Sequence, residues 1–166
     1  MRAGIAFGSN LGESLLFLRQ ARSCVLASPL LGPPVIASGV YLTSPVDCPP
    51  GSGSFLNAVL EAELTGDPAA LLRDLHACEQ GLGRPARSRR NAPRVIDLDF
   101  LYAGDCQLNT SDLTLPHPRI SARRFVLAPL AEIRPGLILP GQTRTIAELL
   151  EKLPPGDSVE PLDARW

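Results

Sequence analysis

Strand-like and helix-like apolar patterns alternate along this chain in the order strand, helix, strand, strand, helix, strand. Residues 4–8 form a short apolar run that breaks at Gly8, and the apolar residues between Leu15 and Leu26 recur with helical spacing. The Ser and Asn before that run are candidate helix caps. This order predicts an α+β, ferredoxin-like βαββαβ fold, in which two helices pack on one face of an antiparallel sheet.

The second and third strands of this order flank a long loop. A breaker at residues 31–34 precedes two strand-like segments, 35–45 and 55–64. The Pro- and Gly-rich stretch between them, residues 45–53, is too long for a tight hairpin. Loops of this length in small domains are often functional.

The second helix and the fourth strand flank an arginine-rich segment. Asp67 followed by Pro68 predicts a capped helix that runs to about residue 80, and residues 95–104 are the clearest strand. Residues 84–94 carry five Arg and no acid or large apolar side chain. Because such a segment cannot build a core, we expect an exposed, mobile loop.

Additional C-terminal elements follow this core order. The sequence predicts a hairpin arm over residues 106–116, a helix over 120–133, a short strand over 137–140, a last helix capped by Thr143 or Thr145, and a peripheral tail over 154–166. With no repeat or linker, we expect one domain over residues 1–166, its core at about 4–140.

Composition excludes several classes of protein. The chain has 166 residues, 45% of them hydrophobic and 20% charged, with a formal net charge of −1. These values are typical of a folded soluble protein and argue against a surface devoted to nucleic acid or membrane. The first ten residues lack the apolar core of a signal peptide, so we expect a cytoplasmic protein.

The cysteines predict neither a metal site nor a disulfide framework. They stand far apart and form no Cys-x-x-Cys pair, and the chain has two histidines to join them. The four are Cys24, Cys48, Cys78 and Cys106.

The strongest chemical signal is Asp97-Leu98-Asp99 in the predicted strand 95–104. On a strand, Asp97 and Asp99 project from the same face, about 7 Å apart at the backbone. Mg²⁺ suits such a pair, because it is held by one or two carboxylates together with substrate phosphates and water. The alternative is an edge strand with a solvated polar face.

The neighbouring arginines favour the metal interpretation. The arginine-rich segment 84–94 ends three residues before Asp97, so both signs of charge share one region. A polyphosphate bridged to metal ions needs both, whereas a solvated charge run or a nucleic-acid contact does not. The chain lacks a P-loop and a G-x-G-x-x-G motif, so Arg, metal and histidine are the groups left to hold the phosphates of any ATP.

The two histidines differ in their surroundings. His117 is followed by Arg119, Arg123 and Arg124, a second basic cluster that could reach phosphate. The alternative is a surface histidine in a Pro-rich turn. His76 lies on the polar side of the second predicted helix, where a surface role is the simpler explanation.

Five sequence blocks together resemble 6-hydroxymethyl-7,8-dihydropterin pyrophosphokinase, over about residues 4–140. They are FGSNLG near the start, Asn57 in FLNAV, GLGR ending at Arg84, PRVIDLDFL over 93–101, and LPHPR followed by Arg123 and Phe125. The resemblance implies a folate-biosynthesis enzyme of ferredoxin-like fold. It would move the terminal diphosphate of ATP to the hydroxymethyl group of the pterin and release AMP.

The resemblance also implies roles for individual residues. Asp97 and Asp99 would hold two Mg²⁺ ions, and Arg84 and Arg94 would be catalytic contacts to the transferring phosphates. The implied ATP-binding set is Leu72, His76, Arg84, Arg90, Arg94, Thr114, His117 and Arg123. The implied pterin-binding set is Thr43, Ser44, Phe55, Asn57, Asp97 and Phe125.

This chain departs from the family pattern at several positions in two loops. Asn91 and Ala92 stand where many members have Trp and Gly in the arginine-rich loop, and Ser44 replaces a Pro. Arg87 is one position later than the second loop arginine of many members, where this chain has Ala86. We therefore carry no role over to Arg87.

Two other functions fit parts of the sequence. A non-catalytic RNA- or DNA-binding domain of ferredoxin-like fold could use the 84–94 arginines, although the exposed aromatic strand pattern of such sheets is missing. A regulatory module of the same fold would bind a small molecule without consuming ATP. The expected partners are ATP and the hydroxymethyl dihydropterin, with no nucleic acid, membrane or obligate protein partner.

Overall fold

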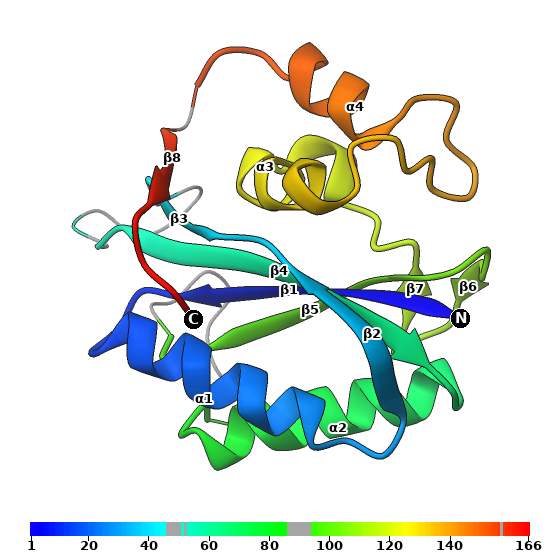
Figure 1. Cartoon of the computed structure of the whole chain (residues 1–166), viewed down its shortest axis with the longest axis horizontal. Coiled ribbons are helices and arrows are strands. Elements are labelled where there is room, and N and C mark those ends of the chain that lie inside the picture. The colour runs from blue at the N-terminus through cyan, green and yellow to red at the C-terminus, as the bar shows by residue number, and fades with distance from the viewer. Residues whose placement is uncertain (46–50, 52, 86–93, 157) are drawn as a thin grey trace.

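The main element of the fold is one antiparallel sheet. The computed structural model describes residues 1–45, 51, 53–85, 94–156 and 158–166 (Figure 1). The strands follow the order β5-β1-β4-β3-β8, and β2 pairs with β4 beside β3. Their bounds are β1 (Arg2–Ser9), β2 (Leu31–Ala37), β3 (Val40–Thr43), β4 (Phe55–Leu64), β5 (Asp97–Ala103) and β8 (Val159–Leu162). The order β5-β1-β4-β3 confirms the predicted ferredoxin-like arrangement.

Helices cover both faces of this sheet. The two helices of the predicted core order, α1 (Ser14–Leu26) and α2 (Pro68–Gly81), lie on one face, and α3 (Arg124–Ile133) and α4 (Ile146–Lys152) lie over the other (Figure 1). The 3₁₀ helix Ile120–Ala122 precedes α3. The predicted hairpin arm is present as β6 (Leu108–Asn109) and β7 (Thr114–Leu115).

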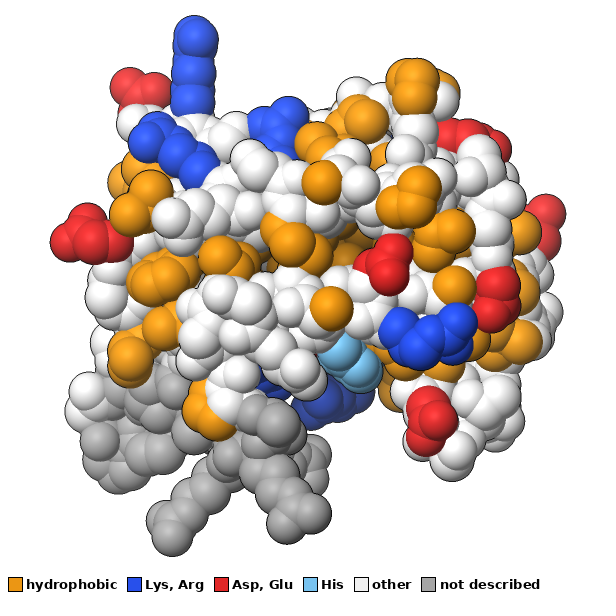
Figure 2. All heavy atoms as spheres, turned by 90° about the horizontal axis from the view of Figure 1, so that it is seen from below, with side chains coloured by type: hydrophobic (Ala, Val, Ile, Leu, Met, Phe, Trp, Pro, Cys, Tyr) orange, Lys and Arg blue, Asp and Glu red, His pale blue; other side chains and the backbone are white. Residues whose placement is uncertain are grey.

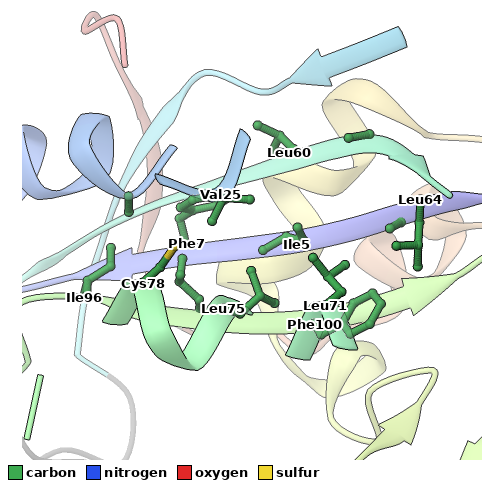
Figure 3. Close-up of a cluster of buried hydrophobic side chains, with 14 of the residues drawn as sticks. Ile5, Phe7, Val25, Leu60, Leu64, Leu71, Leu75, Cys78, Ile96 and Phe100 are labelled. Carbon is green, nitrogen blue, oxygen red and sulfur yellow. The ribbon is translucent and has the colours of Figure 1, made fainter. Parts of the chain in front are cut away.

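Two hydrophobic cores explain the strongly apolar central strands. Ile5 and Phe7 of β1 point toward α1 and α2, where they pack in one cluster with Leu75 of α2 (Figure 3). Ala6, between them in sequence, packs on the opposite side with the α3 residue Leu127. Because successive side chains of a strand alternate between faces, a sheet covered on both sides needs apolar residues at nearly every position.

The two helices on the first face are covalently joined by a disulfide, although the sequence predicts no disulfide framework. Cys24 of α1 and Cys78 of α2 form a disulfide, with Cα atoms 6.0 Å apart. They are 54 residues apart in sequence and become neighbours only when the two helices pack together. Cys106 is a free thiol.

Three local predictions were wrong. The expected breaker at residues 31–34 lies within β2, where the pairing with β4 shifts register between Gly32 and Ile36 and so accommodates the two prolines. Residues 137–140 form no strand and contribute a single bridge, from Ile138 to Thr145. Helix α1 has no side-chain cap from the preceding Ser and Asn.

The last helix begins as one of the two alternatives predicted. Thr145 is its N-cap and accepts a hydrogen bond from the Glu148 N–H, while the Glu148 carboxylate accepts one from the Thr145 N–H. This reciprocal pair is a capping box, and it fixes the start of α4 at Ile146.

The C-terminal segment, expected to be a peripheral tail, completes the sheet. Strand β8 pairs with β3, and Ser44 exchanges hydrogen bonds with Ser158 just beyond the paired residues. The Trp166 ring packs edge-on against Phe7, with centroids 4.9 Å apart, and its indole N–H donates to the Ser38 carbonyl at 2.7 Å. Residues after the expected core therefore contribute to both the sheet and the first core.

The described helices include no candidate for a membrane span. None of them combines the length and the apolar composition that crossing a bilayer requires.

Candidate active site

Polar side chains gather where β4, β1 and β5 lie side by side. The register places Gly8 of β1 opposite Asn57 of β4 on one side and opposite Asp97 of β5 on the other. We call these three residues the polar row. Since Phe7 faces α1 and α2, alternation directs the polar row toward the face that carries α3. Asp99, two residues after Asp97, lies on the same face.

Gly8 leaves the centre of the polar row without a side chain. A Cβ atom at this position would lie 3.0 Å from Asn57 Oδ1 and 3.9 Å from Asp97 Cβ. The amide on one side and the carboxylate on the other are therefore separated by a flat strip of backbone.

Asp97 is the acceptor for two arginines. Arg84 Nη1 lies 2.6 Å and Arg94 Nη1 lies 2.9 Å from Asp97 Oδ1. Both guanidinium groups are largely buried, with side-chain exposures of 20% and 16%. The structure thus brings together the two residues predicted to contact the transferring phosphates and one predicted metal ligand.

Asn10 positions Arg94, a role that the sequence did not reveal. Its side-chain Oδ1 accepts a hydrogen bond from the backbone N–H of Arg94 at 2.9 Å. Its backbone N–H donates to the Arg94 carbonyl at 3.3 Å. The predicted role of this Asn as a cap for α1 was wrong because its side chain is engaged here.

Asp99 forms the second half of the charge cluster. Arg123 Nη1 donates to Asp99 Oδ2 at 2.7 Å, and His117 Nε2 lies 4.0 Å from Asp99 Oδ1. Both the backbone and the ring of His117 are held in place. Its backbone N–H donates to the Leu101 carbonyl at 2.7 Å, and its ring Nδ1 accepts from the backbone N–H of Arg119 at 3.2 Å.

The protonation state of His117 follows from these contacts. Burial lowers the pKa of the ring, and Arg123 and Arg119 lower it further, against the opposing effect of Asp99. The ring is therefore neutral at pH 7. Because Nδ1 accepts a hydrogen bond, the single ring proton is on Nε2, which faces Asp99.

Glu79 of α2 lies directly behind this cluster and was missed by the sequence interpretation. It is 5% exposed, accepts a hydrogen bond from the Leu98 N–H at 2.8 Å, and forms an ion pair with Arg84. Burial raises the pKa of its carboxyl to about 7, against the opposing effects of the Leu98 N–H and Arg84. Its position offered a signal, since Glu79 continues the apolar stripe of Leu71 and Leu75 at four-residue spacing.

The other end of the polar row carries residues of the predicted pterin-binding set. Asn57 and Thr43 are both buried, and Asn57 Nδ2 donates to Thr43 Oγ1 at 2.7 Å. Phe55 is half-buried two residues before Asn57 on the same strand face. Phe125 of α3 is also half-buried, and the Arg123 guanidinium lies 5.4 Å from its ring centroid.

Several predicted residues are not joined to this cluster by described contacts. Leu72 packs at the margin of the first core and His76 is exposed, both on α2. Thr114 is half-buried in β7, where its hydroxyl lies 3.4 Å from Asn109 Oδ1. Arg90 lies outside the described residues, as do the departures from the family pattern in the arginine-rich loop.

The two carboxylates of the cluster suit a hard cation whose remaining ligands come from substrate and water. In the described part of the chain, no three His, Cys, Asp or Glu side chains are arranged to hold a metal ion. Asp97 and Asp99 supply carboxylate oxygens on one face, with side-chain exposures of 30% and 27%. Mg²⁺ is commonly held by two such carboxylates when substrate phosphates and water complete its shell.

Comparison with known proteins identifies the family of this chain. Residues 4–135 match the family model described as 7,8-dihydro-6-hydroxymethylpterin-pyrophosphokinase (HPPK). A 2-amino-4-hydroxy-6-hydroxymethyldihydropteridine pyrophosphokinase of Methylorubrum extorquens is 38% identical, over 93% of this chain and 94% of that protein. The enzyme of the same name from Pseudomonas aeruginosa is 36% identical over 92% of both chains.

Solved structures support the fold independently. A crystal structure of Plasmodium falciparum HPPK-DHPS with pteroate aligns with a TM-score of 0.70 at 14% identity, over 91% of this chain and 42% of that longer chain. The chain described here belongs to the 7,8-dihydro-6-hydroxymethylpterin-pyrophosphokinase family. It is a pyrophosphokinase of folate biosynthesis.

Proposed function

We propose that this protein transfers the diphosphate of ATP to the hydroxymethyl group of 6-hydroxymethyl-7,8-dihydropterin and releases AMP, in a reaction that depends on Mg²⁺. The observation that carries the proposal is the pair Asp97 and Asp99 on one sheet face, each already bound by arginine. Carboxylates and guanidinium groups in alternation are what a metal-bridged polyphosphate requires.

Asp97 and Asp99 would hold the metal ions. Bound there, Mg²⁺ would neutralise phosphate charge and fix the reacting phosphorus relative to the attacking oxygen. The family resemblance implies two ions, which the two carboxylates could share with phosphate oxygens and water.

Four side chains around the aspartates would bind and align the phosphates. Arg84, Arg94 and Arg123 supply N–H groups in fixed planar geometry, and each is held by a carboxylate within 2.9 Å. His117, neutral with its proton on Nε2, can donate a hydrogen bond to a phosphate oxygen. These groups would stabilise the negative charge on the oxygens of the transferred phosphate, so a strong general base is not required.

The Asn57 end of the polar row would bind the pterin. Asn57 and Thr43 present buried polar atoms that can recognise the ring edge, and Phe55 and Phe125 are candidates for stacking on its faces. Gly8 provides the flat strip between this end and Asp97. The hydroxymethyl group would then point toward the aspartates, where the β-phosphorus of ATP would be held.

The rival nucleic-acid function has no support among the relatives, whose names describe pyrophosphokinases and folic acid synthesis proteins. On the face formed by α1 and α2, basic side chains lie in separate groups and not in one continuous stripe (Figure 2). Cytoplasmic location stays a prediction.

The direct test is an assay for AMP. Purified protein, ATP, Mg²⁺ and the hydroxymethyl dihydropterin should yield AMP and the pterin diphosphate, and EDTA should stop the reaction. Asp97→Asn and Asp99→Asn should each lose nearly all activity, whereas the exposed control Asp112→Asn should match the wild type. Formation of ADP, or turnover that survives EDTA, would contradict the proposal.

A further inference from the structure

We propose that Glu79 is a positioning residue that keeps Arg84 beside the phosphate site when Asp97 is occupied by a metal ion. The inference rests on the proposed function, because it assigns Arg84 to the phosphates and Asp97 to the metal. It concerns a buried carboxylate on α2 that no step described above requires.

One nitrogen of Arg84 links two carboxylates of different kinds. Arg84 Nη1 lies 2.6 Å from Asp97 Oδ1 and also donates to Glu79 Oε1. The Asp97 side chain is 30% exposed and belongs to the polar row, whereas the Glu79 side chain is 6% exposed and lies on the helix behind. A ligand that enters from solvent therefore reaches Asp97 and not Glu79.

Glu79 is also fixed by the strand that carries the aspartates. Its Oε1 accepts a hydrogen bond from the N–H of Leu98, the residue between Asp97 and Asp99, at 2.8 Å. The carboxylate is thus tied to the backbone of the metal-binding strand itself. Any group that Glu79 holds keeps a constant position relative to Asp97 and Asp99.

This arrangement gives Arg84 a carboxylate that a metal ion on Asp97 does not engage. A cation bound to Asp97 Oδ1, the oxygen that faces Arg84, would draw on the charge of that oxygen and weaken its contact with the guanidinium. Arg84 would then depend mainly on Glu79. Its planar donors stay ordered and turn toward phosphate instead of moving to solvent, which is the preorganisation that stabilises a transition state.

A purely structural role for Glu79 makes a different prediction. Glu79→Gln retains an oxygen that can accept from the Leu98 N–H but removes the negative charge that Glu79, when ionised, places beside Arg84. If Glu79 acts only as a tie between α2 and β5, this variant keeps its activity. If Glu79 holds Arg84, kcat falls by tenfold or more while KM for the pterin stays within twofold of the wild type.

The kinetic test is a double-mutant cycle of Glu79→Gln and Arg84→Ala. We expect the double variant to be no slower than Arg84→Ala alone, because Glu79 acts through Arg84. Equal fold losses in kcat in both backgrounds would overturn the proposal, as would a Glu79→Gln variant with wild-type kcat. Glu132→Gln is the matched control, because Glu132 also accepts a backbone N–H, from Gly39, outside the charge cluster.

A second measurement does not depend on activity. In a crystal structure of Asp97→Asn without metal or substrate, Arg84 should remain on Glu79, since the carboxylate of Asp97 is gone and Glu79 is intact. In Asp97→Asn/Glu79→Gln it should leave this position. Loss of the Arg84–Glu79 contact in the single variant overturns the proposal even if Glu79→Gln fails to fold. A wild-type protein that forms no AMP would instead refute the proposed function and leave this structural result standing.

Discussion

Gly8 of β1 lies directly opposite Asn57 of β4, and a Cβ atom at position 8 would come within 3.0 Å of Asn57 Oδ1. Asn57 in turn donates to Thr43 Oγ1, so its amide has little freedom to move away. The glycine is therefore required by the space between two polar groups and not by a turn. It keeps the floor of the proposed pterin site flat.

Gly8→Ala should weaken pterin binding selectively. An added methyl group in a tight site costs about 1–3 kcal/mol, which corresponds to an increase in pterin KM of about fivefold to 150-fold. ATP should bind nearly as in the wild type. Steady-state kinetics with each substrate varied in turn would measure both, and Gly136→Ala, where an added Cβ meets nothing within 4 Å, is the control. An unchanged pterin KM would place the pterin elsewhere.

Arg123 connects the two proposed substrate sites. It donates to Asp99 at 2.7 Å and lies over the Phe125 ring at 5.4 Å. Arg123→Ala should therefore raise KM for ATP by tenfold or more, since a charge-assisted hydrogen bond contributes about 1.5–3 kcal/mol, and should raise pterin KM to a smaller extent. The exposed Arg144→Ala serves as the control in the same kinetic assay. An effect on pterin alone would exclude Arg123 from the phosphate site.

The sequence predicted those parts of this site that depend on residues close together along the chain. The bounds of β4 and the shared face of Asp97 and Asp99 follow from local alternation, which a sequence displays directly. The contacts from Asn10 to Arg94 and from Glu79 to Leu98 join separate segments, and the segments meet only in the folded chain. Glu79 was nevertheless detectable as an acid on an apolar helical stripe.

The failures in the fold prediction have the same origin. Two prolines suggested a breaker at residues 31–34, yet pairing with β4 holds them in a strand whose register shifts there. The tail looked peripheral because its few apolar residues show no period. Its strand is specified by the edge of β3, and Trp166 is placed by Phe7 and Ser38, all distant in sequence.

Glu61 should contribute stability that acid removes. It is 1% exposed and is held by Arg2, Arg134 and the Tyr102 hydroxyl. Burial tends to raise the pKa of Glu61, but the hydrogen bonds from Arg134, Tyr102 and Arg2 outweigh burial and lower it below 4.5. A carboxyl with a lowered folded-state pKa stabilises fully above its unfolded pKa and loses this contribution as pH falls through the folded-state value.

Glu61→Gln tests the prediction that acid removes this stability. The variant should lose about 3 kcal/mol of unfolding free energy at pH 7, because Arg2 and Arg134 lose the charge of their buried partner. The difference from the wild type should shrink as pH falls below about 4.5, the ordinary pKa of a glutamate. Urea unfolding between pH 3 and pH 7 measures both effects. Glu63→Gln, at a more exposed position of the same strand, should change little, and a gap that widens in acid would contradict the assignment.

The disulfide between α1 and α2 should stabilise the fold measurably. Closing a loop between residues 54 positions apart is expected to contribute about 4 kcal/mol by restricting the unfolded chain. Without reductant, Cys24→Ser should have an unfolding free energy about 4 kcal/mol lower than that of the wild type. With reductant, the two proteins should be equally stable. Unfolding with and without reductant, plus mass spectrometry of the linked peptides, tests this, with Cys106→Ser as the control. A wild-type protein insensitive to reductant would contradict it.

The contact between Glu79 and the Leu98 N–H affects whether another chain can pair with the edge of the sheet. Strand β5 is the outermost strand of the described sheet on its side, and unpaired N–H groups on such a strand invite another chain to add a strand. The Glu79 carboxyl group accepts a hydrogen bond from the N–H of Leu98, the residue between the two aspartates, at this edge. This contact leaves one fewer edge N–H group open to pairing, and the charged side chains of Asp97 and Asp99 beside it disfavour the approach of another strand at this point.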